Sequence, residues 1–166
     1  MNVPRIIKHI FFGDWQVRRA FPPASLDAIA ATIQSGEKNH GGEVRFVVEA
    51  SLEGAPLWKG QTARGRAIDV FSQLRIWDTE GNNGVLIYLL LADRSVEIIA
   101  DRGIHARTGR MPWAAICRDM ELAYSKSGFL PGTLAGIASI ASVMGQHFPA
   151  QEKRTNELPD TPVVLT

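Results

Sequence analysis

Acidic and amide side chains gather in a short polar stretch near the middle of the chain, and a further acidic residue follows two apolar runs later. The stretch leads from Asp78 through Asn82 and Asn83 into Gly84, and the later group is Asp101-Arg102-Gly103. The apolar runs between them, 85–91 and 96–100, are typical of buried strands. We therefore expect both polar groups at strand ends, where α/β proteins commonly keep their sites.

These side chains carry the hard oxygen atoms that Ca²⁺ and Mg²⁺ prefer as ligands. The predicted metal ligands are Asp78, Asn82, Asn83 and Asp101, provided that the chain returns Asp101 to the polar stretch. Their spacing is not that of an EF-hand, which places ligands at alternate positions and ends on a distant Glu. A structural role is the open alternative, because Asp and Asn also stabilise turns by bonding to their own backbone.

Hydrolysis of a phosphate ester is a second chemistry that the same residues suggest. It needs a metal or a cationic clamp for the developing charge, together with a nucleophile or an activated water. The candidate catalytic residues are the carboxylates Asp78 and Asp101 and the cations Arg102 and Arg66. Arg94 is a further cation, but its surroundings are typical of an exposed hairpin turn. The chain has no phosphate-cradling glycine loop, which counts against an enzyme. Enzymatic activity therefore remains an alternative.

The remaining reactive side chains indicate no mechanism. Cys117 lies among apolar, helix-like positions, which favours a buried thiol over a nucleophile. As the single cysteine it excludes an internal disulfide and fits a reducing compartment. His105 is the histidine nearest to it in sequence, and a solvated loop residue explains it as well as an acid or base does.

Length and charge narrow the classes of protein to consider. The chain has 166 residues, of which 45% are hydrophobic, and this is enough for one core. Its 18 basic and 17 acidic residues give a formal net charge of +1, which predicts no nucleic-acid partner. No apolar run reaches the ~20 residues of a membrane span, and the amino terminus lacks the pattern of a signal peptide. We expect a cytoplasmic location, with peripheral membrane contact as an alternative.

Apolar spacing predicts the elements that position these groups. The run 43–49 is a strand, and the link between 85–91 and 96–100 is too short for a parallel crossover, so those two strands form a hairpin. Ser25 is a candidate N-cap. Helical spacing is found over 4–12, 26–33, 63–77, 113–124 and 133–147. The predicted fold is a three-layer α/β/α sandwich with a short mixed sheet that contains a central β-hairpin.

Three parts are expected along the chain: a basic amphipathic helix with a linker at 1–23, the α/β domain at 24–149, and a flexible tail at 150–166. In the first part, Ile6, Ile7 and Ile10 share a helical face. That face either rests on a protein or membrane-surface partner or covers the domain's own core. The tail has little to bury, although Val163-Val164-Leu165 is able to dock on a sheet edge or a partner.

The order of these elements resembles the TPM domain. The most specific feature is Asn83-Gly84-Val85-Leu86 just before a hydrophobic strand and its hairpin return, and the likeness runs from Ser25 to Phe148. The family includes thylakoid lumenal acid phosphatase-like proteins of photosystem repair and bacterial membrane-linked relatives. The resemblance implies a three-layer α/β/α domain, with weak phosphatase activity in some members and calcium binding in some.

The function implied by the resemblance is that of an accessory or divalent-ion-binding module in the maintenance of protein or membrane complexes. A weak metal-dependent phosphatase acting on phosphate monoesters is the alternative. The matching acidic turn is Asp78 with Asn82 and Asn83, followed by the end of the returning strand at 101–103. Many relatives have a glycine-rich turn where this chain has Ala100-Asp101-Arg102-Gly103-Ile104. Relatives also commonly carry a signal peptide and a membrane anchor. Neither is recognised in this sequence, so an envelope role is not expected here.

Overall fold

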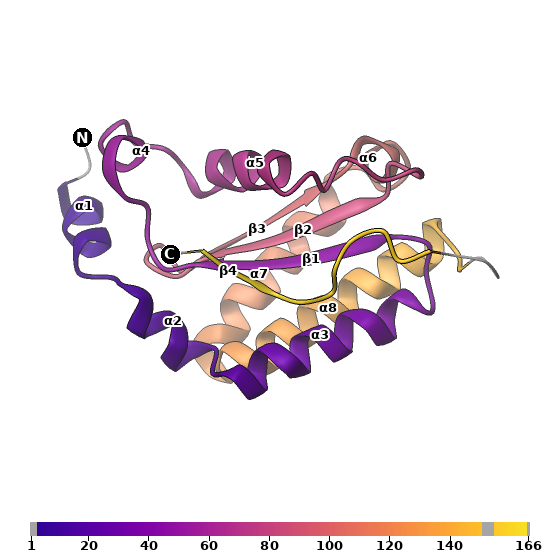
Figure 1. The fold of residues 1–166 in the computed structure, drawn as a ribbon, viewed down its shortest axis with the longest axis horizontal. Helices are drawn as coiled ribbons and strands as arrows, with labels where there is room; N and C mark the ends of the chain where they lie inside the picture. Colours follow the sequence, from indigo (N-terminus) through magenta and orange to yellow (C-terminus); the bar gives the residue numbers. More distant parts are fainter. Residues whose placement is uncertain (1–2, 151–154, 166) are drawn as a thin grey trace.

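A four-stranded sheet forms the middle layer of the computed structural model, which describes residues 3–150 and 155–165 (Figure 1). The strands lie in the order β3-β2-β1-β4. β1 is parallel to β2 and to β4, and β2 and β3 form an antiparallel hairpin. The bounds are Glu43–Glu49 for β1, Gly84–Leu90 for β2, Ser95–Ala100 for β3 and Val163–Leu165 for β4. The predicted mixed sheet with its hairpin is confirmed.

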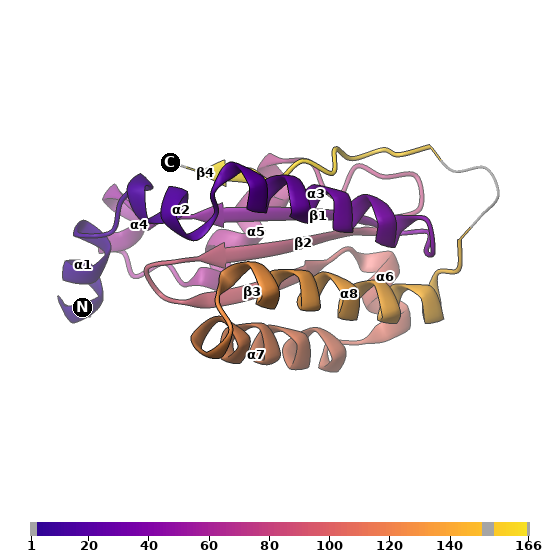
Figure 2. The same ribbon diagram turned by 90° about the horizontal axis from the view of Figure 1, so that it is seen from below.

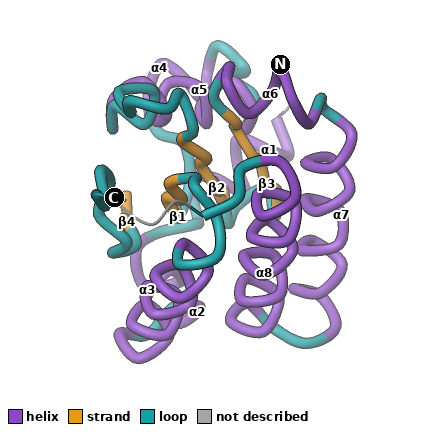
Figure 3. Tube along the Cα trace, turned by 90° about the vertical axis from the view of Figure 1, so that its right-hand side faces the viewer, coloured by secondary structure: helices purple, strands orange, loops and turns teal. Residues whose placement is uncertain are grey.

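Helices cover both faces of this sheet (Figures 2 and 3). One layer contains α2 (Asp14–Ala20), α3 (Pro23–Glu37), α7 (Met111–Lys126) and α8 (Phe129–His147). The other contains α4 (Gly54–Trp58) and α5 (Ala63–Gln73). α1 (Val3–Ile10) lies beside α4 at one end of the molecule, and α6 (Arg102–Thr108) lies at the opposite end (Figure 1). The three-layer α/β/α sandwich is therefore confirmed.

Two separate cores explain why the strands are so apolar. Every residue of β1 and β2 is buried, and successive side chains of a strand point to opposite faces. Phe46 and Ile87 enter the core beneath α3, α7 and α8, whereas Val47 and Leu86 enter the core beneath α5. Because both faces are covered, the strands need apolar residues at nearly every position.

The outer edge of β3 is covered by side chains from two helices. Glu121 of α7 accepts a hydrogen bond from the backbone nitrogen of Val96 at 2.9 Å. Arg64 of α5 donates to the carbonyl oxygen of Ile98 at 2.7 Å and also forms an ion pair with Glu97. Backbone groups at a sheet edge that would otherwise face water thus have partners within the chain.

Several helix ends differ from the predicted ones. α3 begins at Pro23 with Pro22 in the cap position, so Ser25 is not the N-cap; the fixed φ of proline suits the first turn of a helix. α5 ends at Gln73, and Arg75 has a left-handed φ of 51°, which turns the chain away before Trp77. α4 and α6 are short helices in segments that were expected to be loops.

α8 is longer than predicted, because it begins at Phe129 and has 19 residues. By length and composition it is able to cross a membrane, with a mean hydropathy of 1.2, which corrects the expectation that no segment is long enough. Length and composition alone do not identify a transmembrane helix, since the core helix of a globular domain passes the same test. Here Gly136 of α8 sits against Met120 of α7, and Ile140 is fully buried.

The end of the chain forms part of the sheet. β4 pairs with Val47, Val48 and Glu49 of β1. Arg45 of β1 donates to the carbonyl oxygens of Pro159 and Thr161, the latter at 3.1 Å. The alternative that the carboxyl-terminal residues dock on a sheet edge is confirmed.

Candidate functional site

The polar turn before β2 and the turn after β3 meet at the amino-terminal edge of the parallel strands. The backbone nitrogen of Asp101 donates to the carbonyl oxygen of Gly84 at 2.9 Å. Gly103 lies so close to the turn that an added Cβ would stand 2.5 Å from the carbonyl oxygen of Asn82. Arg102 Nε donates to Asn82 Oδ1 at 3.3 Å. We call residues 78–84 and 101–103 the loop junction; the predicted proximity of its two halves is confirmed.

Two buried oxygen atoms of the loop junction have no hydrogen-bond partner among the described residues. One is Asp101 Oδ2; the other carboxylate oxygen, Oδ1, caps α6 by accepting from the backbone nitrogen of Arg102 at 2.7 Å. The second is Asn83 Oδ1, whose amide nitrogen donates to the carbonyl oxygen of Gly41. Both residues are buried. Buried polar atoms are normally paired, so these two oxygen atoms are open to a water or a cation.

Asp78 lies at the exposed rim of the loop junction. Its backbone nitrogen donates to the carbonyl oxygen of Arg75 at 2.9 Å. Thr79 fixes the turn from inside, because its hydroxyl oxygen accepts from the backbone nitrogen of Asn83 at 3.1 Å. The tail approaches on the outside, where Glu157 accepts from the backbone nitrogen of Glu80 at 3.0 Å. The turn thus holds Asn83 inward while Asp78 faces solvent.

The donor set of the loop junction is poor in carboxylates. Among residues 3–150 and 155–165, no group of three or more His, Cys, Asp or Glu is placed to hold a metal ion. A cation here would depend on Asp101, with amide and backbone oxygens of the turn and with Asp78 at the rim. Ca²⁺ accepts such mixed oxygen ligands in flexible geometry, and fewer carboxylates mean weaker binding. The residues therefore fit a site that binds a hard cation with low affinity.

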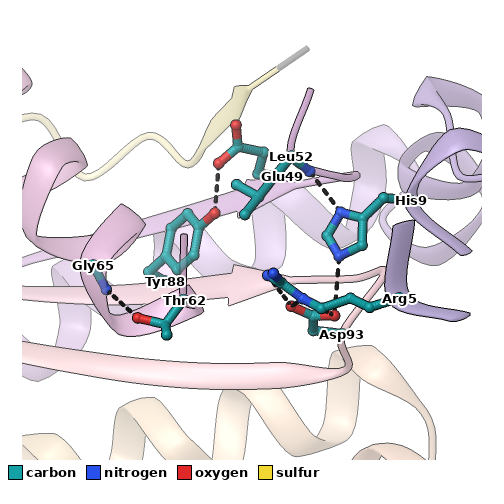
Figure 4. A network of polar contacts seen from close by, with 8 residues as sticks. All are labelled: Arg5, His9, Glu49, Leu52, Thr62, Gly65, Tyr88 and Asp93. Carbon is teal, nitrogen blue, oxygen red and sulfur yellow. Dashed lines mark hydrogen bonds and ion pairs between the residues drawn. The ribbon is translucent and has the colours of Figure 1, made fainter. Parts of the chain in front are cut away.

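Arg66 is not brought to the loop junction. Its Nε and Nη2 atoms both donate to Glu49 at 2.9 Å. The hydroxyl of fully buried Tyr88 donates to the same carboxylate at 2.5 Å (Figure 4). Glu49 ends β1, whereas Glu43, at its start, donates its backbone nitrogen to the carbonyl of Asn83. At ~3.3 Å per residue, these ends lie about 20 Å apart. Of the candidate catalytic residues, Asp101 and Arg102 stay together, with Asp78 in the adjoining turn.

A second polar network, which the sequence did not predict, attaches α1 to the hairpin turn. Arg5 Nη2 donates to Asp93 Oδ2 at 2.8 Å, and His9 Nε2 lies 3.0 Å from Asp93 Oδ1 (Figure 4). The backbone nitrogen of Leu52 donates to His9 Nδ1 at 2.8 Å. Because a backbone N–H can only donate, His9 carries its proton on Nε2. We call these residues the α1 clip.

The α1 clip also corrects the predicted face of the first helix. Ile6 is buried as expected, but its buried neighbour is His9, whereas Ile7 and Ile10 are exposed. The polar partner Asp93 lies far along the chain, so no local pattern could reveal that His9 faces inward. The interpretation in which Ile6, Ile7 and Ile10 together cover the core is wrong.

Asp93→Asn is expected to lower the free energy of unfolding by about 2 kcal/mol at pH 7. Burial alone would raise the pKa of Asp93, but hydrogen bonds from Arg5 and His9, together with the charge of Arg5, hold this pKa below its usual value. Such a carboxylate adds stability above the unfolded-state pKa, near 3.8, and loses it as pH falls through the folded-state pKa. In urea unfolding, the free energies of unfolding of the parent and of Asp93→Asn should converge between neutral and strongly acidic pH. A difference that stays constant with pH contradicts the argument.

The thiol of Cys117 lies in a hollow between β3, α6 and α7. Burial and the charge of Glu97 raise the pKa of Cys117 to about 12, so the thiol is protonated at neutral pH. His105 shares the hollow and is exposed. These surroundings agree with a buried thiol rather than an activated nucleophile. The other lining side chains include Arg64, Arg110, Trp113, Arg118 and Glu121.

Comparison with known proteins supports one family. Residues 18–143 match the family model of the TPM domain. The NMR structure of BA42 protein from the psychrophilic bacterium Bizionia argentinensis is 29% identical, with a TM-score of 0.75, and the match covers 85% of this chain and 92% of that one. The N-terminal domain of a protein from P. gingivalis, also solved by NMR, is 17% identical with a TM-score of 0.62, covering 80% and 83%, and shows the fold alone. Curated proteins give no match.

Proposed function

Because this chain belongs to the TPM domain family, we propose that it is an accessory module that binds a divalent cation, Ca²⁺ or Mg²⁺, at the loop junction. The observation that carries the proposal is the pair of buried oxygen atoms, Asp101 Oδ2 and Asn83 Oδ1, that have no hydrogen-bond partner among the described residues. A cation supplies what both atoms lack, and the negative charge of Asp101 favours a cation over a water molecule.

The cation would join the two halves of the loop junction. Asp101 begins α6, and Asn83 leads into β2, so an ion held between them ties a helix end to a strand end. Asn82 and Asp78 add oxygen atoms from the exposed side. In an accessory module this ion fixes a surface for other components of a protein or membrane complex rather than activating a substrate.

Calcium or magnesium titration of the ¹⁵N-labelled protein tests the proposal. Amide shifts are expected in residues 79–84 and 101–104, and Asp101→Asn should weaken binding at least ~10-fold because the main carboxylate ligand is lost. Asn is as good an N-cap as Asp, so α6 should remain folded. Asp119→Asn, an exposed carboxylate on α7, is the control and should bind like the parent. Equal affinities of the Asp101→Asn protein and the parent contradict the proposal.

A weak metal-dependent phosphatase is the second candidate. The observation that favours it is Arg102, an exposed cation next to Asp101 that contacts the loop junction through Asn82. Its guanidinium would bind the phosphoryl oxygens, and the metal would polarise them. Arg66 takes no part, since it is held by Glu49. Metal-dependent hydrolysis of p-nitrophenyl phosphate that disappears in Asp101→Asn supports this candidate; absence of turnover in the metal-loaded parent removes it.

A further inference from the structure

We propose that the end of the molecule formed by α1, α2 and α4 docks on an anionic membrane surface. Six large apolar side chains of these helices and the turn between them are exposed, from 49% for Val3 to 76% for Phe11. Scattered exposed apolar residues need no explanation, but a contiguous group marks an interaction surface. We call this group the N-terminal face; its members are Val3, Ile7, Ile10, Phe11, Trp15 and Trp58.

The orientation of α1 is the reverse of that of an ordinary surface helix. Val3, Ile7, Ile10 and Phe11 have the spacing of a single helical stripe, and this stripe points to solvent. The side that faces the domain holds Ile6 and the α1 clip, in which Asp93 binds Arg5 and His9 (Figure 4). The polar contacts thus hold the helix in place with its apolar stripe outward. A helix that folded only to cover the core would do the opposite.

α1 and α4 lie at the same end of the molecule, and a fixed turn joins α2 to α1. Ile10 of α1 and Trp58 of α4 line the same hollow. Gln16 of α2 accepts from the backbone nitrogen of Gly13 at 2.7 Å and donates to the carbonyl oxygen of Phe11 at 3.2 Å, which fixes the turn between α1 and α2. Figures 1 and 2 show α1 and α4 together at the end of the molecule away from α6. Docking there leaves the loop junction open to solvent.

The charges around the N-terminal face identify the occupant. Lys8, Arg18, Arg19 and Lys59 are all exposed, and Arg18 and Arg19 follow Trp15 at the spacing of one helical face. The acidic residues of these segments, Asp14 and Glu53, are fewer, although the whole chain is nearly neutral. Two copies of this face would bring like charges together. Anionic headgroups complement the charges, while Trp and Phe are favoured at the membrane–water interface.

Sedimentation with vesicles tests this proposal. The protein is expected to bind vesicles of phosphatidylcholine mixed with phosphatidylserine and to bind pure phosphatidylcholine much more weakly. The assay is run in EDTA, so that an ion at the loop junction cannot bridge to lipid and the proposed function is tested separately. Each Lys or Arg near an anionic surface contributes about fivefold in affinity, so joint replacement of Lys8, Arg18 and Arg19 by Gln should weaken binding roughly 100-fold.

A matched pair of variants separates this surface from general stickiness. Phe11→Ser with Trp15→Ser should reduce vesicle binding at least ~10-fold, whereas Met111→Ser with Leu122→Ser should not, although Met111 and Leu122 of α7 are also exposed. All four side chains are exposed, so urea unfolding should be unchanged. The proposal is overturned if the parent does not bind anionic vesicles, if both pairs bind alike, or if the face instead forms a dimer that Phe11→Ser with Trp15→Ser dissociates.

Discussion

Gly84→Ala is expected to lower the free energy of unfolding by about 3 kcal/mol. This is a large effect for a substitution that adds one methyl group and removes no contact. An added Cβ would overlap the backbone carbonyl oxygen of Ile76 and stand 2.8 Å from its Cγ2 atom. Ile76 is fully buried, and its backbone nitrogen is held by the carbonyl oxygen of Phe71 at 3.0 Å. Neither group can swing aside as a flexible side chain would, so β2 or the turn must shift.

Urea unfolding of Gly84→Ala beside Gly65→Ala checks this expectation. Gly65 lies in the first turn of α5, where the nearest atom to an added Cβ is Thr62 Oγ1 at 3.4 Å. That is ordinary contact, and alanine is the better helix former by up to ~1 kcal/mol. Gly65→Ala should therefore be neutral or slightly stabilising. If the two variants unfold at the same urea concentration, the close approach of Gly84 to Ile76 has no energetic consequence.

Glu49→Ala is expected to lower the free energy of unfolding by about 3 kcal/mol, because one buried carboxylate binds both the half-buried guanidinium of Arg66 and the buried hydroxyl of Tyr88. Its removal leaves the guanidinium of Arg66 without its ion pair and the hydroxyl of Tyr88 without an acceptor in the core beneath α5. Burial, with the nearby charge of Glu49, raises the pKa of Tyr88, so the phenol keeps its proton and depends on an acceptor. An unpaired buried donor costs about 1–3 kcal/mol by itself.

A double-mutant cycle separates these two contributions. In a Tyr88→Phe background no hydroxyl is left unpaired, so Glu49→Ala should cost less there than in the parent, by about 1 kcal/mol or more. The comparison uses guanidinium chloride unfolding of the four proteins. Strict additivity would contradict the claim that Tyr88 and Arg66 share one acceptor, and would leave only the ion pair to explain the loss.

The strands were predictable because burial on both faces requires apolar residues at nearly every position of β1 and β2. β1 has the expected bounds, Glu43–Glu49, and the hairpin follows from a link too short for a parallel crossover. Helix ends were harder, since long-range packing decides them. α5 stops early because Ile76 turns into the core over Gly84. α6 has Ile104 as its single buried residue, so no apolar period announces it.

The loop junction was predictable for the same reason as the hairpin. Once β2 and β3 are antiparallel, the start of one strand and the end of the other must meet, which brings Asp101 to the turn of Asn82. The other polar contacts join residues far apart in sequence. Glu49 holds Arg66, and Asp93 draws His9 inward. Nothing in the local pattern of either partner indicates the other, so the predicted place of Arg66 and the predicted face of α1 were both mistaken.

The covered edge of β3 opposes the addition of strands from other molecules at high protein concentration. A foreign strand that tried to add there would first have to displace Glu121 from Val96 and Arg64 from Ile98. Replacing such charge-assisted hydrogen bonds with ordinary backbone hydrogen bonds gains little. Growth of the sheet into fibrils is thereby obstructed at the β3 edge. At the opposite edge an added strand could pair only with β4, which is three residues long. The domain can be packed densely among its neighbours while its sheet stays finite.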